Sequence, residues 1–435
     1  MNRHLVRSAT VVALLMSLMS LGKIHAKFRG SYDLTSSGKL VWLIVFVALV
    51  ALTGYAFGIP ERPSLRTPLQ TAIIAAFIPP LVVAVGQTMI GQFLLPRMVL
   101  SLSVITNAAV FWLAVKVSSF AATTDARKAR VLLLCDDDEL ATIRSDVAIH
   151  TEIPCVIVGN FNQRHINHDV DVLEQIRNCD PTIVVYSVDQ TAHAHVSPVL
   201  RRLHAEGIRV RTTDDFYDAY LGKVPIRNLE ETSLLFDVRE LHHPSYHRIS
   251  RLFDISVGVI GLIALTLVVP FVLIGNMLGN RGPLLYSQER VGRGGIVFRM
   301  HKFRTMKPSD GPTTWTTAAD PRITPFGRML RSTHIDEIPQ VINILRGDLS
   351  VVGPRPEQPR YVDQLRTTIP FYDCRHLVSP GLTGWAQVNY PYGSDEVDAF
   401  EKLQFEFWYL RHQRLVLDVK IMARTIRHVL GFKGR

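Results

Sequence analysis

The sequence predicts a three-part fold: an N-terminal membrane α-helical bundle, an α/β Rossmann-like domain, and an α-rich (α+β) domain that begins with a further apolar helix. Long, nearly uncharged apolar runs fill residues 1–120, and about 20 such residues suffice to cross a bilayer. Short apolar strands then alternate with helical stretches, which is typical of a parallel sheet. A chain of 435 residues is also long for a single compact core.

The composition supports a membrane protein with anionic partners. Hydrophobic residues make up 47% of the chain, and the mean hydropathy is +0.16. The net charge of +10 fits attraction to an anionic membrane surface or to phosphate-bearing substrates. We expect no nucleic-acid partner, because the sequence has neither zinc-ligand spacing nor a recognition-helix pattern. The four cysteines are scattered without a C-x-x-C pair, as expected of reduced thiols in the cytoplasm.

Residues 1–120 are predicted to form a bundle of four membrane helices. Their apolar runs are Leu5–Leu21, Leu40–Phe57, Leu69–Ile90 and Met98–Val117. The pair Pro79-Pro80 lies inside the third run and should kink it, a bend that neighbouring helices can accommodate. The first run follows Arg3 and Arg7 and therefore also fits a signal peptide. We favour a helix that is retained, and we disfavour a soluble bundle because the apolar runs are so long.

The flanking charges predict how the bundle is oriented. Four spans place the N-terminus and the rest of the chain on the same side of the membrane. The basic residues after the last run are Arg127, Lys128 and Arg130, which argues that this side is cytoplasmic. The loop after the first run is basic as well, with Lys23, Lys27, Arg29 and Lys39, so the charges do not all favour one orientation.

Residues 129–228 are predicted to form the Rossmann-like domain. Its four strands are RVLLLC, PCVIVGN, TIVVYSV and IRVRTT. The first strand runs into Asp136-Asp137-Asp138, where a dinucleotide site needs a glycine-rich turn. Three acids would repel a pyrophosphate there, so we interpret the domain as structural or regulatory. Residues 229–245 follow as a linker.

The third domain, residues 246–435, opens with an apolar helix over residues 249–279. The helix is long enough to span a membrane, and Pro270 is expected to break it. A full crossing would put the following residues on the far side of the membrane, whereas a helix that breaks and returns would keep them on the near side. The residues alone do not choose between these two topologies.

Two adjacent carboxylates, Asp336 and Glu337, stand out in the segment from Arg331 to Pro356, RSTHIDEIPQVINILRGDLSVVGPRP. Neighbouring carboxylates repel each other, so an apolar segment that holds both predicts a nearby cation or an altered pKa. Mg²⁺ suits such oxygen ligands and leaves positions for substrate phosphates. A carboxylate beside a phosphorus can also attack it. The alternative is that both acids lie on the solvated face of an amphipathic helix.

Three segments carry a resemblance to a known family. They are KFRTM (Lys302 to Met306), IDEIPQVINILRGDLSVVGPRP, and PGLTGWAQV (Pro380 to Val388). Together they resemble the bacterial sugar transferases, the polyprenol-phosphate sugar-1-phosphate transferases that are also called monotopic phosphoglycosyl transferases. The resemblance covers residues 246–435 closely, and the rest of the chain matches the long-form members. It implies a re-entrant membrane helix broken at Pro270, although Val269 stands where relatives usually have serine.

The resemblance also implies site residues. Asp336 would be the nucleophile and a metal ligand, with Glu337 as the second catalytic acid beside Mg²⁺. Substrate-binding residues would be Lys302, Arg304, Arg331, Pro354, Arg355, Arg375 and Gln387. Trp385 fits either the substrate motif or a membrane boundary, and Glu406 stands where relatives often have aspartate. The last segments of the chain, with their aromatic and arginine residues, suggest amphipathic helices along the interface.

The implied function is transfer of a hexose-1-phosphate from a UDP-sugar to undecaprenyl phosphate, with release of UMP. This reaction would begin the synthesis of an exopolysaccharide, capsule or lipopolysaccharide O-antigen at the bacterial inner (cytoplasmic) membrane, on its cytoplasmic side. Membrane lipid would be a further partner, and a second copy of the chain could be another, in a homodimer. The residues do not name the hexose.

Two alternatives stay open at this point. One is a membrane glycosyltransferase that moves only the sugar and releases UDP. The other is a non-catalytic scaffold or ligand-sensing regulator of polysaccharide assembly, in which the acidic pair is inert. The released nucleotide separates the first alternative from the transferase, and the absence of turnover would favour the second.

Overall fold

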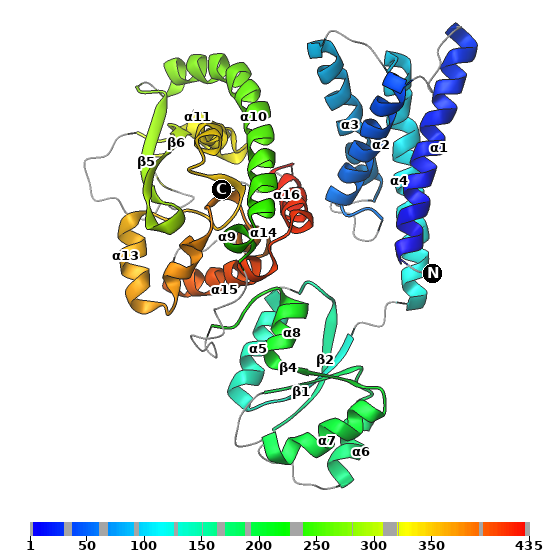
Figure 1. Ribbon diagram of the computed structural model, residues 1–435, viewed down its shortest axis with the longest axis vertical. Helices are drawn as coiled ribbons and strands as arrows, with labels where there is room; N and C mark the ends of the chain where they lie inside the picture. The colour runs from blue at the N-terminus through cyan, green and yellow to red at the C-terminus, as the bar shows by residue number, and fades with distance from the viewer. Residues whose placement is uncertain are drawn as a thin grey trace. The chain divides into compact units, whose positions relative to one another are not determined.

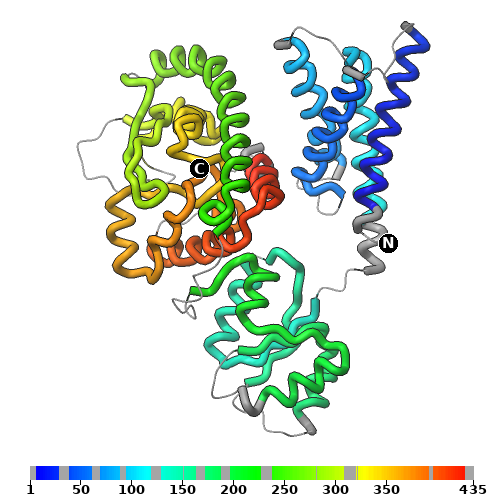
Figure 2. The backbone as a smooth tube through the Cα atoms, in the orientation of Figure 1, coloured from blue at the N-terminus to red at the C-terminus, as the bar shows by residue number. Residues whose placement is uncertain are grey.

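The computed structural model has two compact units, residues 1–126 with 422–434, and residues 127–421; Figure 1 labels their elements and Figure 2 traces the backbone. The structure describes residues 3–29, 37–60, 68–90, 95–125, 129–149, 151–162, 170–187, 193–226, 238–280, 282–307, 320, 322–390 and 395–430.

The N-terminal unit contains the four predicted apolar helices. They are α1 (Arg3–Arg29), α2 (Ser37–Ala56), α3 (Pro68–Ile90) and α4 (Arg97–Asp125). Each has the length and composition of a membrane span, and large apolar side chains such as Ile44, Phe77 and Ile105 face outward. Helix α3 continues through Pro79 and Pro80, as membrane helices can when their neighbours satisfy the freed carbonyls.

One detail of the predicted bundle was wrong. The basic residues that we assigned to the first loop lie within helices: Lys23, Lys27 and Arg29 in α1, and Lys39 in α2. Helix α1 is longer than its apolar run because lysine and arginine are good helix formers and continue the helix at its polar end. These charges therefore mark helix ends rather than an extended basic loop.

The first part of the second unit is an α/β domain with a parallel sheet. Its strands are β1 (Ala129–Leu134), β2 (Cys155–Phe161), β3 (Ile183–Tyr186) and β4 (Arg209–Thr212), in the order β2-β1-β3-β4. Its helices are α5 (Asp137–Ile149), α6 (Val170–Asn178), α7 (His193–Ala205), α8 (Thr213–Phe216) and the π-helix η2 (Tyr217–Leu221). Figure 1 shows helices on both faces of the sheet.

Strand β1 explains why both faces are covered. Its residues Val131 and Leu133 join the apolar cluster under α5 and η2, whereas Leu132 and Leu134 join the cluster under α6 and α7. Successive side chains of a strand point to opposite faces. An apolar run without alternation therefore requires a core on each side, which is the arrangement of a buried parallel sheet.

The rest of this unit is a mixed domain built around a long helix. Its elements are α9 (Arg239–His242), α10 (Pro244–Gly279), β5 (Leu285–Val291), η4 (Arg293–Gly295), β6 (Val297–Phe303), α11 (Pro325–Ser332), η5 (Ile335–Gln340), α12 (Val341–Arg346), β7 (Ser350–Val352), α13 (Pro359–Thr368), η6 (Tyr372–Leu377), β8 (Gly381–Thr383), α14 (Trp385–Asn389) and α15 (Glu396–His412). The unit ends at Ile421, within α16 (Leu415–Leu430). Strands β5 and β6 form an antiparallel hairpin, and β7 pairs with β8 in parallel.

Helix α10 presents two unlike faces. On the inner face, a methyl group on Gly261 would lie 2.5 Å from Val341, and one on Gly275 would lie 2.1 Å from Phe326. Glycine at these positions lets α11 and α12 approach the helix closely. The outer face exposes Leu267 and Leu278, among other large apolar side chains. The expected break at Pro270 was wrong, because α10 continues through this residue as one helix. Proline can bend a helix without ending it, and Figure 1 shows that α10 changes direction along its length.

Candidate active site

The acidic pair lies on η5, a short 3-10 helix. His334 precedes it with a positive φ of 57°, which turns the chain sharply after α11. Helix η5 packs beside β6, so Glu337 faces Lys302 of that strand. The Oε1 atom of Glu337 accepts hydrogen bonds from Lys302 Nζ at 2.7 Å and from Arg355 Nη2 at 3.0 Å. Three charged side chains that are far apart in the sequence thus form one cluster.

This cluster has a clear electrostatic order. Burial alone would raise the pKa of Glu337, but Lys302 and Arg355 together lower it well below its ordinary value. Burial lowers the pKa of Lys302 against the opposing effect of Glu337, and Glu337 raises the pKa of Arg355. Glu337 is therefore ionised at neutral pH, and its charge is compensated by two cations.

Asp336 has the opposite character. Only 8% of its surface is exposed. Burial and the neighbouring charge of Glu337 raise its pKa to about 6, against the influence of Lys302, Arg331 and Arg355. Two adjacent carboxylates with pKa values pushed apart are a common sign of divided chemical roles. Asp336 is poised as a carboxylate that ionises just below neutral pH.

Two predicted substrate-binding arginines are held by neighbouring elements. Arg331 Nε donates to Thr305 Oγ1 at 3.0 Å, which connects α11 to the segment after β6. Arg304 donates to the carbonyls of Pro283 and Asn280, beyond the C-terminal end of α10. Arg331 contributes positive charge near Asp336, whereas Arg304 holds the connection between α10 and the β5–β6 hairpin.

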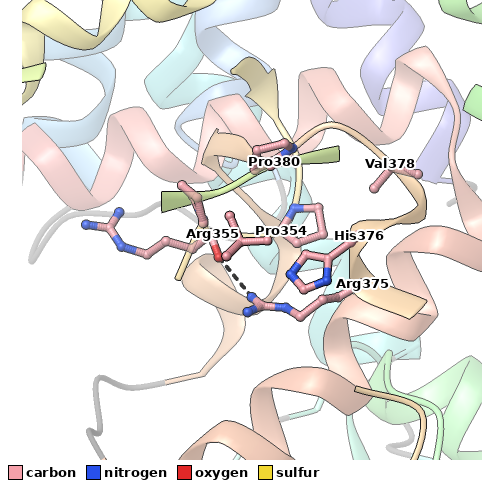
Figure 3. Close-up of a pocket in the computed structure, with 9 residues that line it drawn as sticks. Pro354, Arg355, Arg375, His376, Val378 and Pro380 are labelled. Carbon is pink, nitrogen blue, oxygen red and sulfur yellow. Dashed lines mark hydrogen bonds between the residues drawn. The ribbon is translucent and has the colours of Figure 1, made fainter. Parts of the chain in front are cut away.

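Arg375 lies in a buried ion pair that the sequence did not reveal. It binds Glu406 of α15 through two hydrogen bonds, Nε to Oε2 at 2.8 Å and Nη2 to Oε1 at 2.7 Å. It also donates to Tyr372 Oη and to the carbonyl of Arg355. These partners occupy Nε and both terminal nitrogens, so Arg375 holds the loop that carries Arg355. Figure 3 shows the Arg355 side chain extending away from Arg375.

The loop from Gly353 to Arg355 is fixed from a second side by β8. Gly381 N donates to the carbonyl of Pro354 at 2.8 Å, and Gly353 N donates to that of Thr383 at 2.9 Å. A side chain on Gly353 would lie 2.3 Å from the carbonyl of Ser379. Pro354 therefore acts as part of a rigid turn that directs Arg355 toward Glu337.

Gln387 lies in α14, which follows β8. Its Nε2 donates weakly to the carbonyl of Leu382 at 3.4 Å, and its Oε1 is buried without a hydrogen-bond partner. It therefore contacts the backbone next to the Pro354 turn. A buried acceptor left in this state is one that a water or a ligand could satisfy.

The structure excludes one of the two surroundings left open for Trp385, and the expectation of interfacial helices was wrong for α15. Trp385 does not lie at a membrane boundary, because it is 1% exposed and its Nε1 donates to the carbonyl of Gly222 at 2.7 Å. Helix α15 is not a surface helix, because it buries Leu403, Phe407 and Leu410. Both are core elements, and the partners that cover them lie far away in the sequence.

A further residue that the sequence analysis missed connects α10 to the site. Asp254 Oδ1 accepts hydrogen bonds from Ser350 Oγ at 3.0 Å and from Val351 N at 2.9 Å. These contacts attach β7, and through it the Pro354 turn, to the long helix. A carboxylate inside an apolar helix was the only available signal, because such a group needs a partner.

The acidic pair suits a divalent metal that needs only one or two protein ligands. In the described part of the chain, no three His, Cys, Asp or Glu side chains are grouped to hold a metal ion. Mg²⁺ often takes only one or two protein carboxylates and completes its shell with water and substrate phosphates. Asp336 and Glu337 fit that requirement. Because Glu337 Oε1 already accepts from two cations, Asp336 is the ligand that we expect.

Comparisons with known proteins identify the family of this chain. A family model described as "Bacterial sugar transferase" matches residues 245–432. The chain is 35% identical over 186 residues to the uncharacterized sugar transferase EpsL of Bacillus subtilis, and the match covers 43% of this chain and 89% of that protein. The chain belongs to the bacterial sugar transferase family. This sugar transferase thus carries its site in the part of the chain that the family model covers.

Two longer relatives have more specific names. One is the UDP-N-acetylgalactosamine-undecaprenyl-phosphate N-acetylgalactosaminephosphotransferase of Aeromonas hydrophila, 40% identical over 49% of this chain and 51% of the relative. The other is the UDP-glucose:undecaprenyl-phosphate glucose-1-phosphate transferase of Xanthomonas campestris pv. campestris, 33% identical over 60% and 56%. The sugar transferase thus spans about half the length of each relative.

Proposed function

We propose that this protein transfers a hexose-1-phosphate from a UDP-sugar to undecaprenyl phosphate and releases UMP. The observation that carries the proposal is the pairing of Asp336, with a pKa of about 6, and Glu337, which Lys302 and Arg355 keep ionised. The names of the longer relatives support the two substrates. The reaction would begin the synthesis of an exopolysaccharide, capsule or O-antigen.

In the first step, a carboxylate oxygen of Asp336 attacks the sugar-bearing phosphorus of the UDP-sugar. A new P–O bond forms, the bond from that phosphorus to the bridging oxygen breaks, and UMP leaves with that oxygen and the electron pair. Lys302, Arg331 and Arg355 bind the phosphate oxygens as their charge redistributes. The product is a covalent aspartyl-phosphosugar intermediate.

In the second step, a phosphate oxygen of undecaprenyl phosphate attacks the same phosphorus. The bond to Asp336 breaks, and the carboxylate is regenerated. Two displacements of this kind imply ping-pong kinetics. Mg²⁺, held by Asp336 with Glu337 beside it, would offset phosphate charge.

We propose that α10 enters the membrane and returns rather than crossing it. The elements that carry the site pack on its inner face on both sides of Pro270, at Gly261 and at Gly275. If the helix crossed the bilayer, its two ends would lie on opposite sides of the membrane. One domain on a single side could not then pack against the helix at both glycines. The outer apolar face would then lie in the inner leaflet of the bacterial inner membrane, with the active site at the cytoplasmic surface.

Analysis of the released nucleotide tests the function. Purified protein would be incubated with a panel of UDP-sugars, with and without undecaprenyl phosphate. We expect UMP with the acceptor, and about one equivalent of UMP per enzyme in a burst without it. UDP would indicate a simple glycosyltransferase, and no turnover with any sugar would indicate a scaffold or regulator.

Replacement of the nucleophile tests the covalent step. Asp336→Asn keeps the size of the side chain but removes the attacking charge, so we expect a rate loss of about 10³-fold or more and no burst. Retention of near-normal turnover by this variant would exclude the aspartyl intermediate.

A further inference from the structure

The α/β domain ends in a segment that packs against the catalytic helices α14 and α15. Trp385 Nε1 donates to the carbonyl of Gly222 at 2.7 Å, and Trp408 Nε1 donates to that of Asp218 at 2.8 Å. The two indole rings stack with centroids 4.5 Å apart. Gly222 has a φ of 65°, and a side chain there would lie 3.0 Å from Trp385. The close fit of this segment therefore requires glycine.

A buried lysine lies at the centre of this interface. Lys223 is 3% exposed, and its Nζ lies 2.7 Å from Asp146 Oδ1 and 2.9 Å from Glu401 Oε2. Asp146 belongs to α5 of the α/β domain, whereas Glu401 belongs to α15. One buried cation is thus shared between carboxylates of the two domains. Removing it would leave two partly desolvated anions without their compensating positive charge, although Asp146 would keep its hydrogen bond from Tyr217 Oη.

The backbone strengthens the same contact. Val224 N donates to the carbonyl of Gln404 at 3.0 Å, and Gln404 Nε2 donates to Glu401 Oε1 at 3.0 Å. Gln404 of the same helix therefore orients the Glu401 side chain toward Lys223, and the Val224–Gln404 hydrogen bond adds a backbone contact between the two domains. This part of α15 has little freedom to move independently of the α/β domain.

Helix α15 continues from this contact to the active site. Glu406 lies five positions after Glu401 and forms the buried pair with Arg375. Arg375 donates to the carbonyl of Arg355 at 2.8 Å, and the Arg355 guanidinium contacts Glu337. An unbroken series of polar contacts and one helix thus connects Lys223 to the acidic pair.

We propose that the α/β domain positions the Pro354–Arg355 turn for catalysis, with Lys223 as the positioning residue. Lys223 fixes α15, α15 carries Glu406, and Glu406 holds Arg375 against the turn. The inference rests on the proposed function because it concerns the phosphate contact made by Arg355. It gives the α/β domain a role that needs no bound dinucleotide.

Kinetics of full-length protein in phosphatidylglycerol-containing nanodiscs test the proposal. UMP release would be measured for wild type, Lys223→Met, Glu401→Gln and the double variant. Mutations along such contact networks change coupling enough to alter rates about 2- to 30-fold. We expect Lys223→Met to lower kcat within that range, with the KM for UDP-sugar changed less than about two-fold.

The double variant and two controls make the test specific. If Lys223 acts through Glu401, the double variant should lose no more activity than Lys223→Met alone. Lys223→Arg keeps the cation and should recover most of the rate. Arg177→Met removes an exposed ion pair with Glu206 on the same domain and should leave kcat unchanged. Thermal unfolding of each variant would confirm that it is folded.

Hydrogen–deuterium exchange separates failure of this inference from failure of the proposed function. Lys223→Met should speed exchange in the peptide covering residues 350–357, and Arg177→Met should not. This readout needs no turnover, so it decides the inference even if wild type releases no UMP. Unchanged exchange, an unchanged kcat, or single-variant losses that multiply in the double variant would each overturn it.

Discussion

Two of the acidic clusters in the second unit are built differently, the one after β1 and the one at η5. At the end of β1, Asp136 Oδ1 accepts a hydrogen bond from Glu139 N and so caps α5. Burial raises the pKa of Glu139, against hydrogen bonds from Ser187 and Thr213. At η5, by contrast, Lys302 and Arg355 contact Glu337 directly. Acids become suited to phosphate chemistry when cations, rather than neutral donors, accompany them.

Matched substitutions in the two clusters should differ most in their effect on the rate. Glu337→Gln removes the anion that orders Lys302 and Arg355, so we expect a rate loss of about 10²- to 10³-fold, as when one preorganised charge contact is lost. Glu139→Gln should leave the rate within about two-fold. UMP release measures both variants. Equal losses would show that the contrast between the clusters is mistaken.

The buried pair beside the site should dominate local stability. Arg375→Met leaves Glu406 as an unpaired buried carboxylate, which typically costs about 3–5 kcal/mol. Adding Glu406→Leu should restore part of that loss, because it removes the unpaired charge. Denaturant unfolding of the single and double variants would measure this recovery. If the double variant were no more stable than Arg375→Met, the pair would not account for the loss.

The pKa of Asp336 predicts how activity depends on pH. The carboxylate is the attacking form, and its pKa is raised to about 6, so kcat/KM should fall about ten-fold per pH unit below that value. In Glu337→Gln the residual activity should persist to lower pH, because the neighbouring negative charge is gone. A profile of UMP release from pH 4.5 to 8 tests both statements.

The raised pKa of Asp336 also predicts how folding stability depends on pH. Activity should rise with pH, whereas folding stability should fall. A carboxyl with a raised folded pKa loses stability as the pH rises from its ordinary value of 3.8 toward about 6, because ionisation is then costlier in the folded state. Asp336→Asn removes that cost, so it should be more stable than wild type above pH 6 by about 2–3 kcal/mol. Unfolding at pH 4 and pH 7 would show whether the difference grows with pH.

The smallest effect concerns the helix cap of the α/β domain. Asp136→Ala removes the side-chain acceptor for Glu139 N, and loss of such a cap costs about 1 kcal/mol. Asp136→Asn should be nearly neutral because asparagine caps equally well. Catalytic activity should be unchanged in both. A large rate loss in the asparagine variant would assign chemistry to this cluster.

Much of the fold could be predicted because its signals are local. Apolar runs of sufficient length predict the four N-terminal helices, and uninterrupted apolar strands predict the parallel sheet. The acidic pair was also visible, since adjacent carboxylates in an apolar segment need compensation. The cations that compensate Glu337 are Lys302 and Arg355. Both could be predicted because they lie in the segments that resemble the family.

The contacts that hold the site could not be predicted in the same way. Arg375 finds its partner 31 positions away, and Trp385 finds Gly222 at a separation of 163. From the sequence, a single arginine or tryptophan in a motif is as consistent with substrate binding or a position at the membrane boundary as with a buried contact inside the protein. Only tertiary packing decides which of these surroundings each side chain has.

The two faces of α10 have a practical consequence for protein engineering. The glycines that admit Val341 and Phe326 cannot carry larger side chains without separating the helix from its domain. Outward residues such as Leu267 and Leu278 have no such restriction, since they are 75% and 82% exposed. Polar substitutions confined to that outer surface should make the domain soluble without detergent while its internal packing is kept.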